Sequence, residues 1–378
     1  MTPLDCTLIA FCLTATILHI VTSLLALRRC GQRTALLSAP QCPPLVSILR
    51  PVRGLDCYDE VTLGSSFALD YPNFELIFCC AEADDPAVSL IRSLIARNPG
   101  VEARLLIGNH AICLNPKLNN LVKGWRAAAG DWIVFADSNV LMPRDYVQRL
   151  LTGWRPETGV VCAPPIACGV IGFWAELECA FLNGYQARWQ YAADSIGMGF
   201  AQGKTMLMRR MDLAQAGGIQ VLAQEIAEDA AATKLVRRMG LRAALVDAPF
   251  GQPLGPRTAR QVWDRQTRWA RLRRMSFPGY FAMEIFTGCL FPLAAAAWVA
   301  DTLDVSPAAL LAGLSALWFG AEALLAWGAG WHLRLWSPLA WALRDALLPL
   351  VWMHAWLSER YAWRGNEIST AQQSAPTH

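Results

Sequence analysis

Residues 132–139 read WIVFADSN, and this stretch decides the fold. Five apolar residues in a row, including the β-branched Ile133 and Val134, are typical of a short strand that is buried on both faces. The polar residues that follow mark the point where the strand ends. Ligands of open α/β sheets bind outside the carboxyl ends of the strands, so Asp137 and Asn139 stand where a ligand site is expected.

The sequence on either side of this stretch alternates between strand-like and helix-like segments. Further strands are predicted at residues 45–49, 74–80, 103–107 and 160–163, and helices at residues 86–97 and 116–129. Strands that alternate with helices are typical of a mostly parallel sheet that is covered by helices. Residues 43–250 are therefore expected to form a Rossmann-like α/β domain.

The two ends of the chain are much more apolar than its middle. Of the 378 residues 54% are hydrophobic, the mean hydropathy is +0.28, and 16 are Trp, a residue that accumulates at membrane surfaces. Residues 6–27 contain no Asp, Glu, Lys or Arg, and a helix of that length spans roughly 30 Å of hydrocarbon. Arg28 and Arg29 follow, so we expect an uncleaved anchor with the next domain in the cytoplasm.

Three apolar segments follow Arg274, at residues 281–300, 307–330 and 336–357. The last contains Arg344, Asp345 and Pro349, so a spanning helix and an interfacial or re-entrant helix both remain open there. The organisation expected is an anchor at 1–30, an α/β domain with an Arg-rich interfacial helix (261–274) at 31–280, membrane helices at 281–368, and a disordered polar tail at 369–378.

Charge and cysteine usage exclude several classes of protein. The net charge of +3 comes without a long basic run, so no nucleic-acid partner is expected. The 12 Cys residues form no C-x-x-C pair and the five His residues are scattered, so no zinc site is predicted. This pattern fits a reducing compartment such as the cytoplasm.

Two acidic motifs follow predicted strands. In the first, Asp84-Asp85-Pro86, two interpretations remain open: Asp85 caps the helix that begins at Pro86, or its carboxylate holds the base or ribose of a nucleotide. In the second, Asp137 with the neutral oxygen of Asn139 is placed to hold Mg²⁺ or Mn²⁺ against a diphosphate. Hard cations prefer oxygen ligands, and phosphates can complete their coordination.

Two further motifs stand at predicted helices. Glu228-Asp229 begins one, where acids stabilise the helix dipole; alternatively, Asp229 acts as a general base that removes the proton of an attacking hydroxyl. Residues 265–269 read RQTRW within the Arg-rich helix. Either this helix is an anchor attracted to anionic lipid, or Arg265 and Arg268 stabilise a departing diphosphate while Trp269 contacts the acceptor.

The order of these motifs resembles that of the ceramide glucosyltransferases, the lipid-directed, inverting GT-A enzymes of glycosyltransferase family 21. The family pattern has three Asp positions followed by (Q/R)-x-x-R-W, and Asp85, Asp137, Asp229 and the RQTRW stretch match it. Shorter matches are LDYP at 69–72, ARLLIG at 103–108, NPKLNNL at 115–121 and QAGG at 215–218. The resemblance covers residues 46–274 and, loosely, the membrane ends, and is to a bacterial member.

The resemblance implies a role for each matched residue. Asp85 and Lys117 would bind the nucleotide sugar, Asp137 would serve the metal and the diphosphate, and Asp229 would be the base. The leaving group and the acceptor would be served by Arg265, Arg268 and Trp269. The implied donor is UDP-glucose or UDP-galactose, the implied acceptor is ceramide, and the anomeric configuration inverts. The enzyme would be integral to a bacterial inner membrane, with a cytoplasmic catalytic domain.

One departure from the family pattern leaves the acceptor open. Gln186 stands where the animal-type enzymes have His, and residues 199–204 also differ. Processive enzymes that glycosylate diacylglycerol, and hopanoid-directed enzymes, therefore remain alternatives. A processive polysaccharide synthase would keep the same acids but usually needs more membrane helices. A non-catalytic membrane scaffold would bind no nucleotide sugar.

Overall fold

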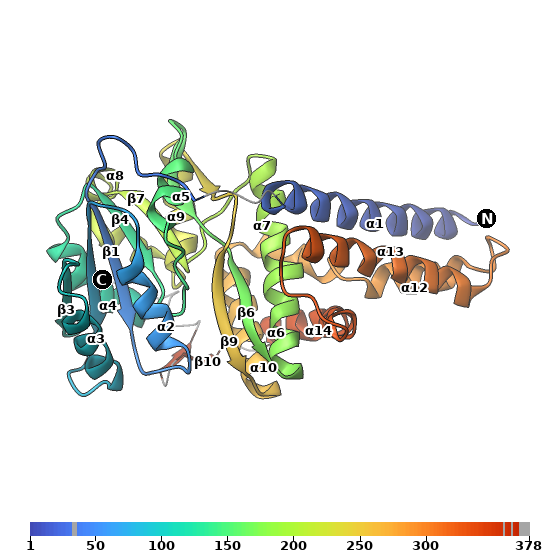
Figure 1. The fold of residues 1–378 in the computed structure, drawn as a ribbon. Coiled ribbons are helices and arrows are strands. Elements are labelled where there is room, and N and C mark those ends of the chain that lie inside the picture. The colour runs from blue at the N-terminus through green and yellow to red at the C-terminus, as the bar shows by residue number, and fades with distance from the viewer. Residues whose placement is uncertain (32–35, 358–359, 364–365, 370–378) are drawn as a thin grey trace. The chain divides into compact units, whose positions relative to one another are not determined.

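The computed structural model describes residues 1–31, 36–357, 360–363 and 366–369 (Figure 1). The chain divides into two units. The sheet unit comprises residues 33–169 and 193–255, and the helical unit comprises residues 1–32, 170–192 and 256–378. The helical unit is thus assembled from three separate segments of the chain.

Strand β4 (Trp132–Ala136), which leads into Asp137, lies in the middle of the seven-stranded sheet of the sheet unit. The strand order is β3 (Ala103–Ile107), β2 (Phe74–Cys80), β1 (Val46–Val52), β4, β7 (Thr205–Arg209), β5 (Thr158–Cys162) and β8 (Arg242–Leu245). The pairs from β3 to β4 and the pair β5–β8 are parallel, whereas β7 runs antiparallel to both of its neighbours. The prediction of a mostly parallel α/β sheet is confirmed.

Two helices of the sheet unit begin with proline and a side-chain cap. In α3 (Pro86–Arg97) the Asp85 carboxylate accepts from the Ala87 amide, and in α4 (Pro116–Ala127) Asn115 accepts from two amides of the first turn. Gly124 lets α4 approach the sheet closely, because a Cβ there would lie 2.8 Å from Cys79 Sγ. The Asn115 cap fixes the first turn of α4, and the close approach at Gly124 packs a later turn of the helix against β1 and β2.

The remaining elements of the sheet unit are short. Its other helices are α2 (Asp59–Gly64), η1 (Ser65–Ala68), α5 (Tyr146–Thr152), α8 (Arg210–Gln215), η3 (Gly218–Gln224) and α9 (Glu228–Arg238). A two-stranded pair, β6 (Pro165–Ile171) with β9 (Phe250–Pro256), occupies the positions where the chain passes from one unit to the other. The apolar core under the sheet is formed by fully buried side chains such as Ile48, Phe78 and Val134.

The helical unit contains helices long and apolar enough to cross a membrane. Its elements are α1 (Pro3–Cys30), α6 (Phe173–Ala180), the π-helix η2 (Phe181–Ala187), the start of α7 (Arg188–Ser195), α10 (Ala259–Ser276), α11 (Pro278–Met283), η4 (Glu284–Phe286), α12 (Leu290–Val299), α13 (Pro307–Gly328), α14 (Ser337–Leu357), β10 (Arg360–Trp363) and β11 (Asn366–Ser369). Among the described residues α1 and α13 meet that criterion, and the pair Pro278–Phe286 and Leu290–Val299, bent by 46°, adds a third if it is one span. The segment 281–300 is therefore broken rather than one continuous helix.

The charged side chains in the apolar helix α14 are paired inside the helical unit. Arg344 lies 2.6 Å from Glu322 of α13 and 2.7 Å from Asp345, and all three side chains are buried. A buried charge is tolerated when it is paired in this way. Among the described residues, α14 is not one of the helices that meet the criterion for a membrane span. The tail predicted at 369–378 falls almost entirely outside the described residues; Ser369 ends β11.

Candidate active site

Asp137, the first residue after β4, lies between two lysines. Its Oδ1 atom is 2.6 Å from Lys117 Nζ, and its Oδ2 atom is 2.9 Å from Lys204 Nζ. Lys117 stands in the first turn of α4, and Lys204 directly precedes β7. The antiparallel pairing of Ala136 with Thr205 brings Lys204 to the end of β4, where its carbonyl accepts from the Asp137 amide at 3.0 Å.

Lys117 also connects this pair to the start of α9. Its ammonium lies 2.5 Å from Glu228 Oε1 and donates to the Gly203 carbonyl at 2.6 Å. Asn115 donates to Glu228 Oε2 at 2.7 Å and to the Ile226 carbonyl at 2.9 Å. Because Asn115 also caps α4, one amide side chain fixes both Lys117 and Glu228.

Asp229 faces the turn that contains Gly203. Its Oδ2 atom accepts from the Gly203 amide at 2.9 Å, and its Oδ1 atom accepts from the Ala230 amide at 2.8 Å. A Cβ on Gly203 would lie 2.8 Å from Glu228 Oε1 and 3.2 Å from Asp229 Oδ2. The turn can therefore approach both acids only because residue 203 is glycine.

The surroundings shift the pKa values of these groups in different directions. Burial, together with the negative charge of Glu228, raises the pKa of Asp229 to about 6. Burial also acts to raise the pKa of Asp137, but Lys117 and Lys204 outweigh it and hold that pKa below its usual range. Near neutral pH Asp137 is therefore a fixed anion, whereas Asp229 is poised to exchange a proton.

Arg50 supports the loop that carries Asp137. The guanidinium is buried, and its Nη2 atom donates to the carbonyls of Asp137 at 2.9 Å, Ser138 at 2.9 Å and Val140 at 3.1 Å. Its Nη1 atom donates to the Thr62 carbonyl at 2.7 Å. Arg50 thereby joins the end of β1 to the loop after β4 and places a positive charge beneath it.

Asp85 caps a helix, which is one of the two roles that the sequence left open for it. Besides capping α3, its two oxygens lie 3.0 and 2.9 Å from the Gly54 amide nitrogen. Gly54 has φ of +66°, a left-handed conformation that favours glycine. Asp85 therefore fixes the loop after β1, and its contact with a nucleotide stays a prediction.

The residues predicted for the leaving group lie on α10 in the helical unit. Arg265 forms an ion pair with the buried Glu178, which Arg257 also contacts at 3.2 Å. The Arg265 guanidinium stacks over Trp269 at 5.9 Å from the ring centroid. Arg268 is half-buried on the same helix, and its catalytic role stays a prediction. The Arg-rich stretch 261–274 lies within α10 (Ala259–Ser276), which begins with a capping box at Thr258.

Gln186, the residue that departs from the family pattern, lies in the π-helix η2. Its side-chain amide donates to Gln266 Oε1 at 3.3 Å, next to Arg265 in the sequence. Single π-helical turns are frequent at functional sites. The departure from the family pattern therefore falls beside the RQTRW stretch within the helical unit.

The donor atoms around Asp137 fit a hard divalent cation when a diphosphate completes the coordination. The carboxylate of Asp137 and the amide oxygen of Asn139 are the kind of oxygen ligand that Mg²⁺ and Mn²⁺ accept. A cation held by both residues would have to displace the Lys204 ammonium, which contacts both of them. Within the described part of the chain, no three His, Cys, Asp or Glu side chains converge to form a metal site by themselves. Protein atoms would therefore supply only part of the coordination.

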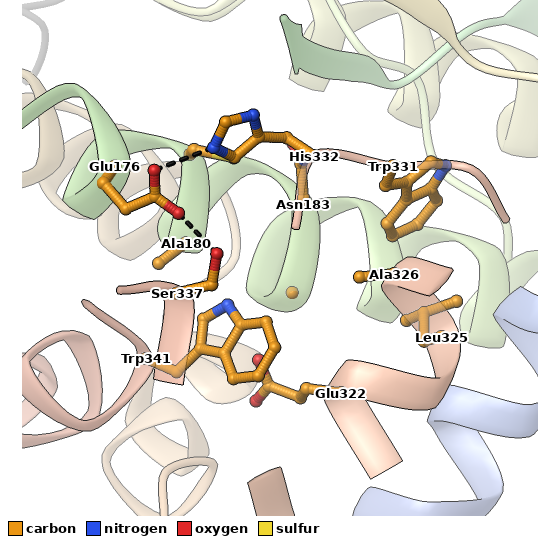
Figure 2. A pocket seen from close by; sticks show the side chains of 12 residues that line it. Glu176, Ala180, Asn183, Glu322, Leu325, Ala326, Trp331, His332, Ser337 and Trp341 are labelled. Carbon is orange, nitrogen blue, oxygen red and sulfur yellow. Dashed lines mark hydrogen bonds and ion pairs between the residues drawn. The ribbon is translucent and has the colours of Figure 1, made fainter. Parts of the chain in front are cut away.

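A separate pocket lies in the helical unit (Figure 2). Glu176 accepts from Ser337 and lies 2.7 Å from His332 Nε2, while Trp331 and Trp341 form apolar walls. The cavity volume is about 10 Å³, close to the space that one water molecule needs. The pocket therefore has room for a bridging water and not for a lipid head group.

Reasoning from the sequence missed several residues of the site. From the sequence, Glu228 is expected only to stabilise the dipole of its helix, and Gly203 and Lys204 belong to a stretch that differs from the family. Asn115-Pro116 is a typical helix start, so a capping residue was detectable there. No sequence signal reveals the additional contact of Asn115 with Glu228, which depends on the folded arrangement of α4 and α9.

Comparisons with known proteins show the family to which the chain belongs. A model of the family described as "Glycosyl transferase family 21" matches residues 7–375. Ceramide glucosyltransferase 3 of Caenorhabditis elegans is 27% identical over 338 residues, covering 87% of this chain and 73% of that protein. Ceramide glucosyltransferase 1 of the same organism is 28% identical over 249 residues, covering 65% of this chain, and the chain spans only 53% of its length.

Among solved structures, a mannosyltransferase from Pyrobaculum calidifontis, in complex with GDP-Man and Mn²⁺, is similar with a TM-score of 0.53. The match covers 90% of this chain and 99% of that one at 20% identity. At that identity the likeness concerns the fold, which is the GT-A glycosyltransferase fold.

Proposed function

The chain belongs to glycosyl transferase family 21, and from this we propose that it transfers glucose, or another hexose, from a UDP-sugar to a lipid hydroxyl with inversion. Ceramide is the proposed acceptor, by analogy with the relatives named above. The observation that carries the proposal is the arrangement of Asp229 beside Glu228, Lys117 and Asp137 at the end of β4.

Asp229 is the proposed base. Its carboxylate takes the proton of the lipid hydroxyl while that oxygen forms a bond to the anomeric carbon. The bond between the anomeric carbon and the diphosphate oxygen breaks, and UDP departs with the bonding electrons. A pKa of about 6 suits this step, because the carboxylate is ionised at neutral pH and still basic enough to accept a proton.

The Asp229 oxygens accept from backbone amides, whereas Glu228 is not the proposed base because an ammonium group contacts one of its two oxygens. One lies 2.5 Å from Lys117 Nζ, and the other accepts from Asn115. We assign Glu228 to the positioning of Lys117 and to raising the pKa of Asp229.

Asp137 and Asn139 are the proposed ligands of Mg²⁺ or Mn²⁺, which when bound would neutralise charge on the diphosphate. Lys117 and Asp85 are proposed to contribute to donor binding. Arg265 and Arg268 are proposed to stabilise the departing diphosphate, and Trp269 to contact the acceptor.

The chain is membrane-associated, and we propose the bacterial inner membrane with the sheet unit in the cytoplasm. α1 ends in Arg28 and Arg29, and Lys and Arg next to a membrane helix are enriched on its cytoplasmic side. The Arg-rich helix α10 directly precedes the apolar segment that contains α12 and α13, as expected for a helix at an anionic surface.

Mass spectrometry of lipids from a host that expresses the chain tests the proposal. We expect one new lipid class heavier than ceramide by a single hexose, absent in the Asp229→Asn variant. A series of diacylglycerol products with several hexoses would show that the enzyme is processive and uses diacylglycerol instead of ceramide. A hexosylated hopanoid would show that the acceptor is a hopanoid and leave the rest of the proposal unchanged. A lipid profile identical to that of the empty host, with the protein folded in the membrane, contradicts the proposal.

A further inference from the structure

Lys204 occupies the space between the two expected metal ligands. Its ammonium lies 2.9 Å from Asp137 Oδ2 and donates to Asn139 Oδ1 at 3.1 Å. These are the two oxygens between which a divalent cation would be held at this loop. The positive charge at that point is therefore supplied by the protein itself.

The position of Lys204 is fixed by the backbone rather than by its side chain. Its carbonyl accepts from the Asp137 amide at 3.0 Å, its amide donates to Gln202 Oε1 at 2.8 Å, and Thr205 begins the β7 pairing with β4. The lysine stem must therefore emerge beside the end of β4, and only 13% of the side chain is exposed. Such a placement is unlike that of a freely mobile surface lysine.

The charge balance also distinguishes this loop from one with two carboxylates. Asn139 takes away one negative charge relative to an Asp at that position, and Lys204 adds one positive charge. A loop with two acids repels a diphosphate unless a divalent cation is present. Lys117 is shared between Asp137 and Glu228, whereas Lys204 lies against Asp137 and the neutral Asn139, so a diphosphate at this loop meets the Lys204 ammonium without a divalent cation.

We propose that Lys204 is a diphosphate-binding residue that takes over part of the charge neutralisation usually supplied by the metal ion. When the donor binds, the ammonium exchanges its contact with Asn139 for a contact with a diphosphate oxygen. UDP consequently binds the protein with a measurable affinity in the absence of divalent cations. The inference rests on the proposed function, because it presumes a UDP-linked donor.

Calorimetric titration of UDP into the full-length protein in detergent tests the inference, first in EDTA and then with Mn²⁺. We expect wild type to bind UDP in EDTA, and Lys204→Met to bind it at least about tenfold more weakly, the loss expected for one charge-assisted contact. The Lys204→Arg variant keeps the charge and should stay within about threefold of wild type.

Lys234→Met is the matched control. Lys234 lies on α9 and pairs with Glu225 at 2.5 Å, so its removal deletes a lysine of the same unit outside the site. Its UDP affinity should equal that of wild type. Thermal unfolding of all variants verifies that they are folded.

The outcomes separate the two proposals. UDP binding by wild type only with Mn²⁺, or equal affinities of wild type and Lys204→Met in EDTA, would overturn the role of Lys204 and leave the proposed function standing. No UDP binding by folded wild type in either condition would overturn the proposed function as well.

Discussion

The Gly203 amide donates a hydrogen bond to the Asp229 carboxylate at 2.9 Å. The glycine thus orients the proposed base, and it does so from the turn that also carries the neighbouring Lys204.

Gly203→Ala is expected to lower turnover by at least about tenfold while the protein stays folded. The added methyl group would meet Glu228 Oε1 at 2.8 Å, and shifting that acid disturbs its contact with Lys117. Gly100→Ala is the control, because a Cβ there meets nothing within 4 Å. Steady-state kinetics of both variants check the prediction, which fails if the two variants are equally active.

The pH dependence should show the titration of Asp229. A general base works when it is deprotonated, so kcat/KM should fall about tenfold per pH unit below pH 6 and level off above it. Glu228→Gln removes a negative charge that raises this pKa, so its acidic limb should move to lower pH. Asp229→Asn should lose about 10² to 10⁴ in kcat. If the acidic limb of the kcat/KM profile lies at the same pH in Glu228→Gln as in wild type, Glu228 does not raise the pKa of Asp229.

Arg50→Met should destabilise the protein by about 2 to 4 kcal/mol, because it removes the buried guanidinium that donates to the carbonyls of Ser138 and Val140. The KM for the UDP-sugar should rise as well, since the same loop carries Asp137. Arg97→Met, at an exposed pair with Glu60, should change neither quantity. Thermal unfolding measures the stability of each variant, and steady-state kinetics measure the KM. Unchanged stability of Arg50→Met would disprove the role of Arg50 in supporting the Asp137 loop.

Asp85 combines a structural contact with a proposed donor contact, and two substitutions separate them. Asp85→Ala should lower stability by about 1 kcal/mol through loss of the α3 cap, whereas Asp85→Ser should keep most of that stability. Both should raise the KM for the donor. A normal KM in a stable Asp85→Ser variant would leave capping as the whole role of Asp85.

Arg344→Met should destabilise the helical unit by about 3 kcal/mol or more, because it leaves the buried Glu322 and Asp345 without their shared partner. Glu322→Gln should cost less, since Asp345 still pairs with Arg344. Arg334→Met, on an exposed residue, is the control. Thermal unfolding in detergent compares the stability lost by the three variants. A smaller loss in Arg344→Met than in Glu322→Gln would contradict the prediction.

Much of the sheet was predictable because apolar runs are local signals. The bounds of β2, β3, β4 and α3 agree with the sequence prediction. The antiparallel β7 was missed, since its partners β4 and β5 are distant in the sequence and its direction depends on the fold. The broken helix at 281–300 was also missed, because hydropathy does not reveal the bend between η4 and α12.

The site was predictable where one residue carries the signal and not where two residues must meet. Asp137 and Asp229 are predicted from their motifs and Lys117 from the family resemblance, and the three residues lie in one connected group. The contacts of Glu228 with Lys117 and of Lys204 with Asp137 join segments far apart in the chain. The ion pair of Arg265 with Glu178 is of the same kind and was equally hidden.

The insertion of residues 170–192 into the sheet unit has a practical consequence for protein engineering. A fragment trimmed to residues 36–257 would lose α1, α10, α13 and α14 but keep α6 and η2. Glu178 would then lack Arg265, Arg188 would lack Thr22, and the apolar faces of Leu177 and Phe181 would be uncovered. A water-soluble fragment for studies of donor binding therefore requires replacing residues 170–192 by a short polar connection, because cutting at the two termini alone would yield an aggregating product. Without α10 and its RQTRW stretch, such a fragment is not expected to transfer sugar.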